Sequence, residues 1–380
     1  MNRAPARIGD GVDAIDTPAL VIDLDAMERN LAAMAEFART HGMRLRPHAK
    51  MHKSGRIALL QMAAGAVGVC VQKVSEAEAL ADAGVTDIFV SNEVVAPAKL
   101  ARLAALAGRV KLAVAVDSAL GVQRLADALR AAGTALDVFV EIDVGQGRCG
   151  VAPAAAGALA HQVVAHAAPG GGGMRFAGLQ AYHGRAQHLR RVAEREAAIH
   201  HAVALVRAAQ ASITSAGIAC PLVTGAGSGS FGFEAVSGVY GELQPGSYLF
   251  MDADYADNEA ATDVPRFEHA LFLKSQVMSH GSSHAVIDAG HKSHAIDSGL
   301  PRVWSLSGAV GCDFANGGDE HGILLSHGDA LPALGATVWL VPGHCDPTVN
   351  LHEHLVGVRG GLADGTVEEL FPVDARGCMR

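Results

Sequence analysis

The chain has 380 residues, half of them apolar and 18% charged, which is enough hydrophobic surface for a large core and more than one small domain. Asp and Glu outnumber Lys and Arg by 39 to 30, so the formal charge is −9. This balance argues against a nucleic-acid-binding protein, which needs a basic surface. No apolar run approaches the roughly 20 residues of a membrane span, and the first residues lack the apolar core of a signal peptide. The six cysteines show no C-x-x-C spacing, as is typical of reduced thiols, so we expect a cytoplasmic protein.

Short apolar runs alternate with Ala- and Leu-rich segments along the first two thirds of the chain. A lead strand is predicted at 19–24, and eight further strands follow at 44–50, 67–73, 87–92, 110–117, 136–143, 176–183, 222–227 and 242–250. Apolar residues at helical spacing predict helices between the strands, for example at 25–41, 74–83, 96–107, 118–132 and 190–216. Eight strand–helix units predict a (β/α)8 barrel. A doubly wound open sheet is the competing fold, but no G-x-G-x-x-G motif follows an early strand.

The remaining third of the chain has a different pattern of predicted secondary structure. Strands are predicted at 267–278, 285–288, 304–307 and 336–341, with Gly-, Pro- and His-rich turns and no helices between them. We therefore predict a barrel domain at 20–255 and a C-terminal β domain at 256–380. The N-terminal strand segment at about 1–19 is expected to join the β domain. The glycines at 170–173 predict a flexible connection before the sixth barrel strand.

Polar residues stand at the expected C-terminal ends of the barrel strands, where the active sites of such barrels lie. They are Lys50, Gln72, Asn92, Asp117, Asp143, Arg148, Tyr182, His183 and Thr224. Any one of them alone is an ordinary strand terminator. As a set, they predict a polar site at one mouth of the barrel.

Lys50 is the most informative of these residues. Arg46, His48, His52 and Lys53 surround it in the sequence, and nearby like charges would favour the neutral amine. A neutral lysine is what a Schiff base with an aldehyde cofactor requires. The alternative interpretation is a basic strand end in solvent.

Two segments are rich in small residues. Segment 224–230 follows the seventh predicted strand, and segment 244–248 lies in the eighth. Small residues let backbone N–H groups approach an anion, and the hydroxyls of Thr224 and Ser228 can add hydrogen bonds. Barrel enzymes often bind phosphate at this position, so we predict a phosphate site there, with two tight turns as the alternative.

Three histidines suggest further chemistry. His344 and Asp346 lie two apart in a segment expected to be extended, so both side chains would face one cation such as Mn²⁺, Mg²⁺ or Zn²⁺. Tyr182 and His183 can line the pocket from either side of the chain. His188, on the next loop, is a candidate general base, because imidazole titrates near neutral pH. An H-x-D pair and a loop histidine are often purely structural.

Taken together, these motifs resemble the D-threonine aldolase family, including the similar 3-hydroxy-D-aspartate aldolases, which are pyridoxal-phosphate enzymes of the alanine-racemase fold type. The resemblance runs from about Asp16 to the C-terminus. Its residues are 46–53, 70–76, 91–95, 143–151, 178–184 and 243–248, with His344 and Asp346. Three positions depart from the family pattern: Met51 is unexpected, Ala226 replaces a glycine, and Arg185 adds a charge near His188.

The resemblance implies a role for each matching residue. Lys50 would bond covalently to pyridoxal 5'-phosphate, His188 would deprotonate the substrate hydroxyl, and a divalent cation (Mn²⁺ or Mg²⁺) would bind His344 and Asp346. The cofactor would be surrounded by Gln72, Arg148, Tyr182, His183, Thr224, Gly225, Gly246, Ser247 and Tyr248. The family also implies a homodimer in which the β domain of one subunit completes the site of the other.

The expected reaction is cleavage of a 3-hydroxy-D-amino acid to glycine and an aldehyde. The substrate stays open between D-threonine and 3-hydroxy-D-aspartate, whose second carboxylate would need a cation such as Arg185, His291 or Lys292. A D-serine-type dehydratase of the same fold is the main alternative. An amino-acid racemase would need a second proton donor and no metal. A pyridoxal-phosphate carrier would lack the β domain, and a cofactor-free metallohydrolase would show more metal ligands on the barrel strands.

Overall fold

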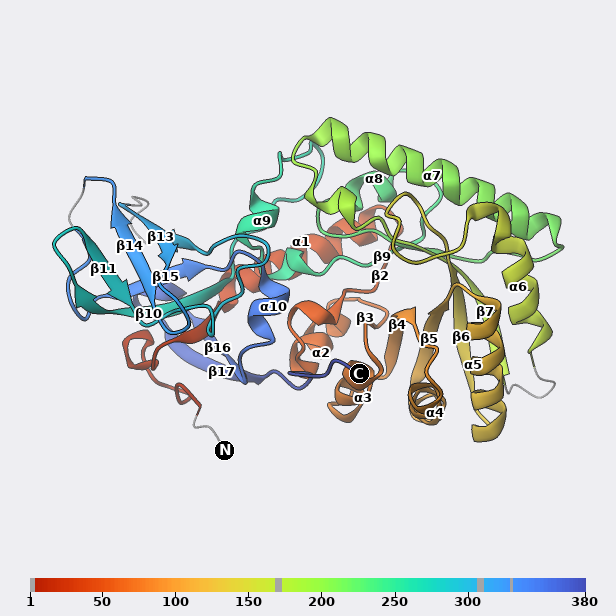
Figure 1. Ribbon diagram of the computed structural model, residues 1–380, viewed down its shortest axis with the longest axis horizontal. Coiled ribbons are helices and arrows are strands. Elements are labelled where there is room, and N and C mark those ends of the chain that lie inside the picture. The colour runs from red at the N-terminus through yellow and green to blue at the C-terminus, as the bar shows by residue number, and fades with distance from the viewer. Residues whose placement is uncertain (1–3, 168–172, 306–310, 329–330) are drawn as a thin grey trace.

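The structure is a computed structural model that describes residues 4–167, 173–305, 311–328 and 331–380. It contains two sheets, and Figure 1 shows the β-rich part at one end of the long axis and the barrel at the other. The predicted glycine connection at 170–173 and the predicted strand at 304–307 lie partly outside the described residues. No helix in those described ranges is long and apolar enough to cross a bilayer.

The first sheet is the predicted barrel. Its eight strands are all parallel and follow the order β2-β9-β8-β7-β6-β5-β4-β3. A parallel bridge between His48 and Cys70 joins the two edges, so the sheet closes on itself. The strands are β2 (Arg44–Leu45), β3 (Val69–Val71), β4 (Asp87–Glu93), β5 (Lys111–Val116), β6 (Ala135–Glu141), β7 (Gly173–Ala181), β8 (Val223–Gly225) and β9 (Glu242–Leu243). Each lies within or close to a predicted run, and the barrel fold is confirmed.

Two of these strands are much shorter than predicted. β2 ends at Leu45 and β9 ends at Leu243, whereas strands were expected to continue to 50 and 250. Pro47 and Pro245 follow two residues after these ends, and proline has no N–H to donate to a sheet ladder. Short 3-10 turns, η2 (Ala49–Met51) and η5 (Ser247–Leu249), replace the missing strand ends.

Helices surround the barrel (Figure 1). The longer ones are α1 (Leu24–Thr40), α2 (Gly55–Ala63), α3 (Val74–Asp82), α4 (Pro97–Leu106), α5 (Ala119–Ala132), α6 (Ala156–Ala165) and α7 (Val192–Ser215). Local signals set their ends. Asp23 caps α1 by accepting a hydrogen bond from the N–H of Ala26 at 3.0 Å, Ser118 caps α5 in the same way, and α5 ends at Gly133 in the left-handed conformation.

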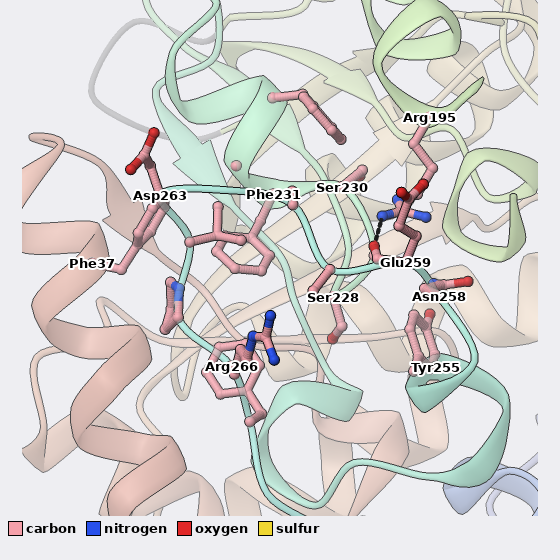
Figure 2. A pocket seen from close by; sticks show the side chains of 18 of the residues that line it. Phe37, Arg195, Ser228, Ser230, Phe231, Tyr255, Asn258, Glu259, Asp263 and Arg266 are labelled. Atoms are coloured by element: carbon pink, nitrogen blue, oxygen red, sulfur yellow. Dashed lines mark hydrogen bonds between the residues drawn. The ribbon is translucent and has the colours of Figure 1, made fainter. Parts of the chain in front are cut away.

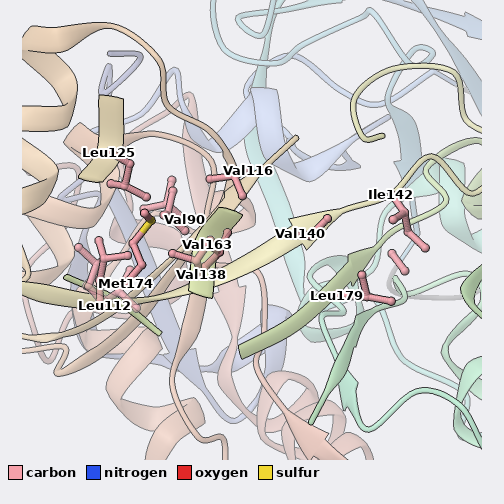
Figure 3. Close-up of a cluster of buried hydrophobic side chains, with 14 of the residues drawn as sticks. Val90, Leu112, Val116, Leu125, Val138, Val140, Ile142, Val163, Met174 and Leu179 are labelled. Carbon is pink, nitrogen blue, oxygen red and sulfur yellow. The ribbon is translucent and has the colours of Figure 1, made fainter. Parts of the chain in front are cut away.

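Apolar side chains from the barrel strands and the helices form one continuous core. Figure 3 shows part of it, with Val138 and Leu112 from the strands and Leu125 from α5. Inside the barrel, the rings of Phe89 and Phe139 lie 4.8 Å apart. The interior is therefore packed and is not a channel, as in other barrels of this type.

The second sheet has nine strands in the described residues, in the order β13-β14-β11-β10-β1-β16-β17, with β15 paired to β10 and β12. The lead strand β1 (Ala19–Asp23) lies here, antiparallel to β10 and parallel to β16. The other strands are β10 (Leu271–His280), β11 (His284–Ile287), β12 (Arg302–Trp304), β13 (Cys312–Asn316), β14 (Gly322–Ser326), β15 (Thr337–Val341), β16 (His354–Arg359) and β17 (Thr366–Pro372). Short helices α8 (Phe231–Ala235), α9 (Ala253–Ala256), α10 (Cys345–Val349) and α11 (Gly361–Asp364) complete the described elements.

Candidate active site

A cavity of about 190 Å³ lies at the C-terminal ends of the barrel strands, and His344 and Asp346 at the start of α10 also line it. Residues from both ends of the chain therefore line it. They are His48, Lys50, Gln72, Ser91, Arg148, Gln180, Tyr182, His188, Ala226, Gly227, Ser228, Gln244, Gly246, Ser247, Tyr255, His344 and Asp346. This is the face of the barrel on which the sequence predicts the site.

Lys50 lies in the η2 turn, and its amine reaches the cavity. Its Nζ lies 3.3 Å from Oδ2 of Asp346, and 40% of the side chain is exposed. The carboxylate comes from α10, about 300 residues later in the chain. The two sheets thus meet at an ion pair between the candidate cofactor lysine and a candidate metal ligand.

The predicted lowering of the Lys50 pKa is wrong. Burial lowers the pKa of the Lys50 ammonium, but the carboxylate of Asp346 outweighs it and the net pKa is raised. The expected like charges are missing because burial keeps the pKa of His48 well below its ordinary value and lowers that of His52 to about 4. Arg46 is charged, but it binds the carboxylates of Asp87 and Glu242.

His344 and Asp346 face one point, although the predicted reason is wrong. The segment is not extended: His344 caps α10 and Asp346 lies in its first turn. The helix start still brings Nε2 of His344 to 3.8 Å from Oδ1 of Asp346. Asp252 lies behind them and accepts a hydrogen bond from Nδ1 of His344 at 2.8 Å. This contact leaves Nε2 as the free ring nitrogen.

These residues fit a divalent cation. Oδ1 of Asp346 is buried and has no hydrogen-bond partner in the described part of the chain. A histidine whose other nitrogen binds a carboxylate is the usual form of a metal-ligating imidazole. The described residues contain no group of three His, Cys, Asp or Glu that could hold a metal. A cation held by His344 and Asp346 would keep open positions for water or substrate.

His188 belongs to a hydrogen-bonded pair with Asp254. Its Nδ1 donates to Oδ2 of Asp254 at 2.6 Å, which leaves Nε2 free on the cavity side. Arg190 binds the other oxygen of the same carboxylate. Burial raises the pKa of Asp254, but the hydrogen bonds from His188 and Arg190 outweigh it and lower the pKa to about 2. Asp254 is therefore ionised and fixes the orientation of the imidazole.

Small residues form the end of the cavity where phosphate is predicted. The loop 226–228 and the corner at Gly246 and Ser247 both line it. Oγ of Ser228 accepts a hydrogen bond from the N–H of Tyr248 at 2.9 Å, which ties the two segments together. A Cβ on Gly227 would lie 2.5 Å from Oε1 of Gln187, so a larger residue would require the side chain of Gln187 to move. The lining suits an anionic group.

Four predicted cofactor residues do not line this cavity. Thr224 is fully buried in the barrel, where its hydroxyl donates to Glu242 at 2.9 Å, and Gly225 lies in strand β8 beside it. Tyr248 is also fully buried, with its hydroxyl on Gln61. His183 does not line the cavity, and its Nδ1 accepts a hydrogen bond from the N–H of Ala186 at 3.3 Å, whereas Tyr182 does line it.

The other six predicted cofactor residues line the cavity: Lys50, Gln72, Arg148, Tyr182, Gly246 and Ser247. Gln72 approaches Nε2 of His48 with its amide nitrogen at 2.9 Å. The guanidinium of Arg148 lies over the ring of Tyr182, 5.9 Å from its centroid. These positions agree with the prediction, while the roles of the residues stay predictions.

The sequence-based analysis missed several residues of the site. Ser91, Asp252, Asp254 and Tyr255 belong to the site but were not predicted as site residues. The ring of Tyr255 lies between those of His188 and His344, with centroids 5.5 and 6.3 Å away. The two acidic residues and one aromatic residue within 252–255 were the signal available, but their partners lie far away in the sequence.

The cations expected to receive a second substrate carboxylate do not line the cavity of this chain. Arg185 is exposed on the η4 turn (Arg185–His188). His291 binds Asp319 at 2.6 Å, and Lys292 binds Glu320 at 2.6 Å, both on the surface of the second sheet. Within one described chain, none of the three reaches the site.

A second and larger cavity, of about 470 Å³, adjoins the first. The two share Ser228 and Tyr255 as lining residues. Figure 2 shows this second cavity, with Phe231 near its centre and Arg195 and Tyr255 at its edge. Of the residues predicted for the site, it contains Ser228 and the neighbouring Gly229 and Ser230 from the small-residue segment 224–230.

The barrel and attached sheet define an alanine-racemase-like fold. The family model for the N-terminal domain of alanine racemase matches residues 22–254, and that for a putative serine dehydratase domain matches 270–358. The solved structure of D-threonine aldolase from Filomicrobium marinum superposes with a TM-score of 0.94 at 50% identity and covers all of both chains.

Two curated aldolases are similar to this chain over nearly its whole length. The chain is 48% identical to D-threonine aldolase from Arthrobacter sp., over 99% of this chain and 97% of that protein. It is 45% identical to 3-hydroxy-D-aspartate aldolase from Paracoccus denitrificans (strain Pd 1222), over 98% and 95%. The chain belongs to this aldolase family and is a carbon–carbon lyase.

Proposed function

We propose that this protein cleaves 3-hydroxy-D-amino acids between Cα and Cβ, to glycine and an aldehyde, with pyridoxal 5'-phosphate and a divalent cation as cofactors. One observation carries the proposal: a single cavity contains the amine of Lys50, the free nitrogen of His188, and the facing ligand atoms of His344 and Asp346. The named activities of the two aldolase relatives support the same reaction.

The residues present fit both cofactors. Lys50 would hold pyridoxal phosphate through its amine, with the segments 226–228 and 246–247 near the phosphate. His344 and Asp346 would hold the cation. When bound, pyridoxal phosphate supplies an electron sink for the breaking bond and the cation supplies positive charge for an oxygen.

The remaining steps belong to the chain's own side chains. Nε2 of His188 accepts the proton of the substrate's C3 hydroxyl, because Asp254 holds the other ring nitrogen protonated. As this proton leaves, the C3 oxygen becomes the carbonyl of the aldehyde and the Cα–Cβ bond breaks. The electron pair left on Cα then takes up one proton to give glycine. The ring of Tyr255 lies beside both His188 and His344 and keeps water from that side of the cavity.

A dehydratase is the second candidate. The family model that covers 270–358, and with it His344 and Asp346, is named for a putative serine dehydratase. The same cavity would then release water and yield a keto acid. The higher identity to the aldolases over nearly the whole chain favours carbon–carbon cleavage.

One product assay separates the two reactions. Purified protein is incubated with D-threonine and with 3-hydroxy-D-aspartate, and aldehyde, keto acid, glycine and ammonia are measured with and without EDTA. We expect aldehyde and glycine, loss of activity in EDTA, and recovery with Mn²⁺. Glyoxylate, the aldehyde product from 3-hydroxy-D-aspartate, is itself a 2-oxo acid, so glycine and ammonia decide between the two reactions. Ammonia without glycine would establish the dehydratase, and full activity in EDTA would exclude the metal.

Two variants test the roles of single residues in this function. Lys50→Ala should lose the visible absorption of bound cofactor after dialysis, whereas wild type keeps it.

Arg185→Ala should leave kcat/KM unchanged for both substrates, because Arg185 does not line the cavity. A selective loss with 3-hydroxy-D-aspartate would place Arg185 at the substrate. The homodimer and the cytoplasmic location stay predictions.

A further inference from the structure

Lys53 is a buried cation close to the site that the proposed reaction does not use. It is 8% exposed and follows the turn that carries Lys50. Its φ is 52°, the left-handed region that non-glycine residues seldom adopt. Such strained positions persist only where several contacts hold them, and they cluster at functional sites. The contacts of Lys53 therefore indicate what the position does.

On one side, Lys53 binds the barrel beside the cavity. Its Nζ lies 3.1 Å from Oε1 of Glu76, a carboxylate that is 4% exposed. The other oxygen of Glu76 accepts the backbone N–H groups of Gln72 at 2.9 Å and Lys73 at 3.1 Å. Gln72 itself lines the cavity.

On the other side, the same amine binds the end of α10. Nζ of Lys53 donates to Oδ1 of Asn350 at 2.9 Å and to the carbonyl of Ala375 at 3.4 Å. Asn350 is the C-cap of α10, the helix that begins at His344 and carries Asp346. Its Oδ1 also accepts the N–H of Gly377 at 3.1 Å, and Lys53 O accepts the N–H of Ala375 at 3.0 Å. The C-terminal segment is thus tied to the same point.

We propose that Lys53 is a positioning residue that holds α10, and with it the His344–Asp346 pair, against the turn that carries Lys50. The amine of Lys53 binds the barrel, the end of α10 and the C-terminal segment at the same time. It thereby holds Asp346 next to Lys50. The inference rests on the proposed cation site at His344 and Asp346. Removing the tie leaves both cation ligands present but lets α10 shift.

Mn²⁺ affinity of the purified protein tests the proposal without relying on turnover. Asn350→Ala removes the link to α10 and leaves the buried Lys53–Glu76 pair intact. The double variant Lys53→Met/Glu76→Gln removes both charges together, so no buried charge is left unpaired. Residues that orient metal ligands change affinity by about 10–100-fold when replaced, and we expect each variant to bind Mn²⁺ at least about tenfold more weakly. Asn350→Asp keeps the acceptor oxygen and should restore affinity.

Lys274→Met is the matched control. Lys274 is another buried lysine, 2% exposed, and its Nζ donates to the carbonyls of Val12 at 2.9 Å, Asp13 at 3.2 Å and Ile15 at 2.7 Å, away from the cavity. This variant should be less stable but should bind Mn²⁺ like wild type. Circular dichroism and cofactor absorption confirm that each variant is folded.

Each outcome has a definite meaning. Weak Mn²⁺ binding in both Lys53-network variants, with normal binding in Lys274→Met and Asn350→Asp, supports the proposal. Unchanged affinity in the folded variants, or an equal loss in Lys274→Met, overturns it and leaves the proposed function standing. A wild-type protein that does not bind Mn²⁺ overturns the cation site itself.

Discussion

Asp254 decides which nitrogen of His188 can accept a proton. As a carboxylate it only accepts hydrogen bonds, so Nδ1 must carry the proton and Nε2 is free. In Asp254→Asn, the side-chain amide can donate to Nδ1 and favour the other tautomer. We expect kcat to fall about 100-fold or more, the size of a general-base contribution, with little change in cofactor content. Steady-state kinetics with D-threonine measures the effect.

Asp257→Asn is the control for this variant. Asp257 lies three residues further along, binds Arg302, and has a 42% exposed side chain, so its loss should leave kcat close to that of wild type. If Asp254→Asn retained full kcat, His188 would not be the base that removes the hydroxyl proton.

The same carboxylate predicts a component of acid sensitivity. The pKa of Asp254 is lowered from 3.8 to about 2, so its stabilising contribution is complete above its unfolded-state pKa and disappears as the pH falls through about 2. The side chain is 7% exposed, and the shift corresponds to about 2 kcal/mol. Urea unfolding of wild type should show this loss below about pH 4, and Asp254→Asn should lack it. Parallel pH profiles for the two proteins would contradict the assignment.

At the residue scale, position in a barrel strand made much of the site predictable. Lys50, Gln72 and Tyr182 follow strands, and the C-terminal ends of parallel strands meet at one mouth. The orienting residues Asp252 and Asp254 could not be predicted, because their partners come from other segments and no short pattern links them. Thr224 was assigned to the cofactor, but a hydroxyl beside a buried glutamate bonds to that glutamate.

Gly178 in β7 lies against the backbone of Leu222, which precedes β8. Gly178 has φ 137° and lies at a register shift between β6 and β7. A Cβ there would lie 1.8 Å from the carbonyl oxygen of Leu222, which accepts the N–H of Leu179. Gly178→Ala must therefore displace the β7–β8 pairing. We expect a loss of about 3 kcal/mol in unfolding free energy, measured by urea titration.

Gly217→Ala separates this collision from backbone strain. Gly217 has φ 75° just after α7, and no atom lies within 4 Å of its missing Cβ. Only the left-handed strain of about 1 kcal/mol remains there. An equal loss in both variants would show that strain alone, and not the contact with Leu222, requires glycine at 178.

At the element scale, the barrel strands were more predictable than the second sheet. Strands such as β4 and β5 are buried on both faces, so they read as continuous apolar runs. β13, β14, β16 and β17 were missed because polar, glycine and exposed positions interrupt them, and their pairing is set by distant partners. α10 was read as extended because five residues are too few for a helical period.

The whole molecule is needed to form the candidate site. Lys50 comes from the barrel, His344 and Asp346 come from the helix that follows β15, and β1 carries the start of the chain into the second sheet. Neither sheet alone supplies both groups. A cation that binds only this assembled arrangement must stabilise the whole fold, since binding to the native state alone raises its stability by mass action.

We therefore expect Mn²⁺ to raise the melting temperature of EDTA-treated protein in one cooperative transition. At about 100 times Kd the stabilisation is about 2.7 kcal/mol, which corresponds to roughly 3 °C for a chain of this size. His344→Ala should show no such shift, because Asp346 alone is a single ligand. An equal shift in His344→Ala would mean that Mn²⁺ binds elsewhere, and the two-ligand centre on α10 would then lose its support.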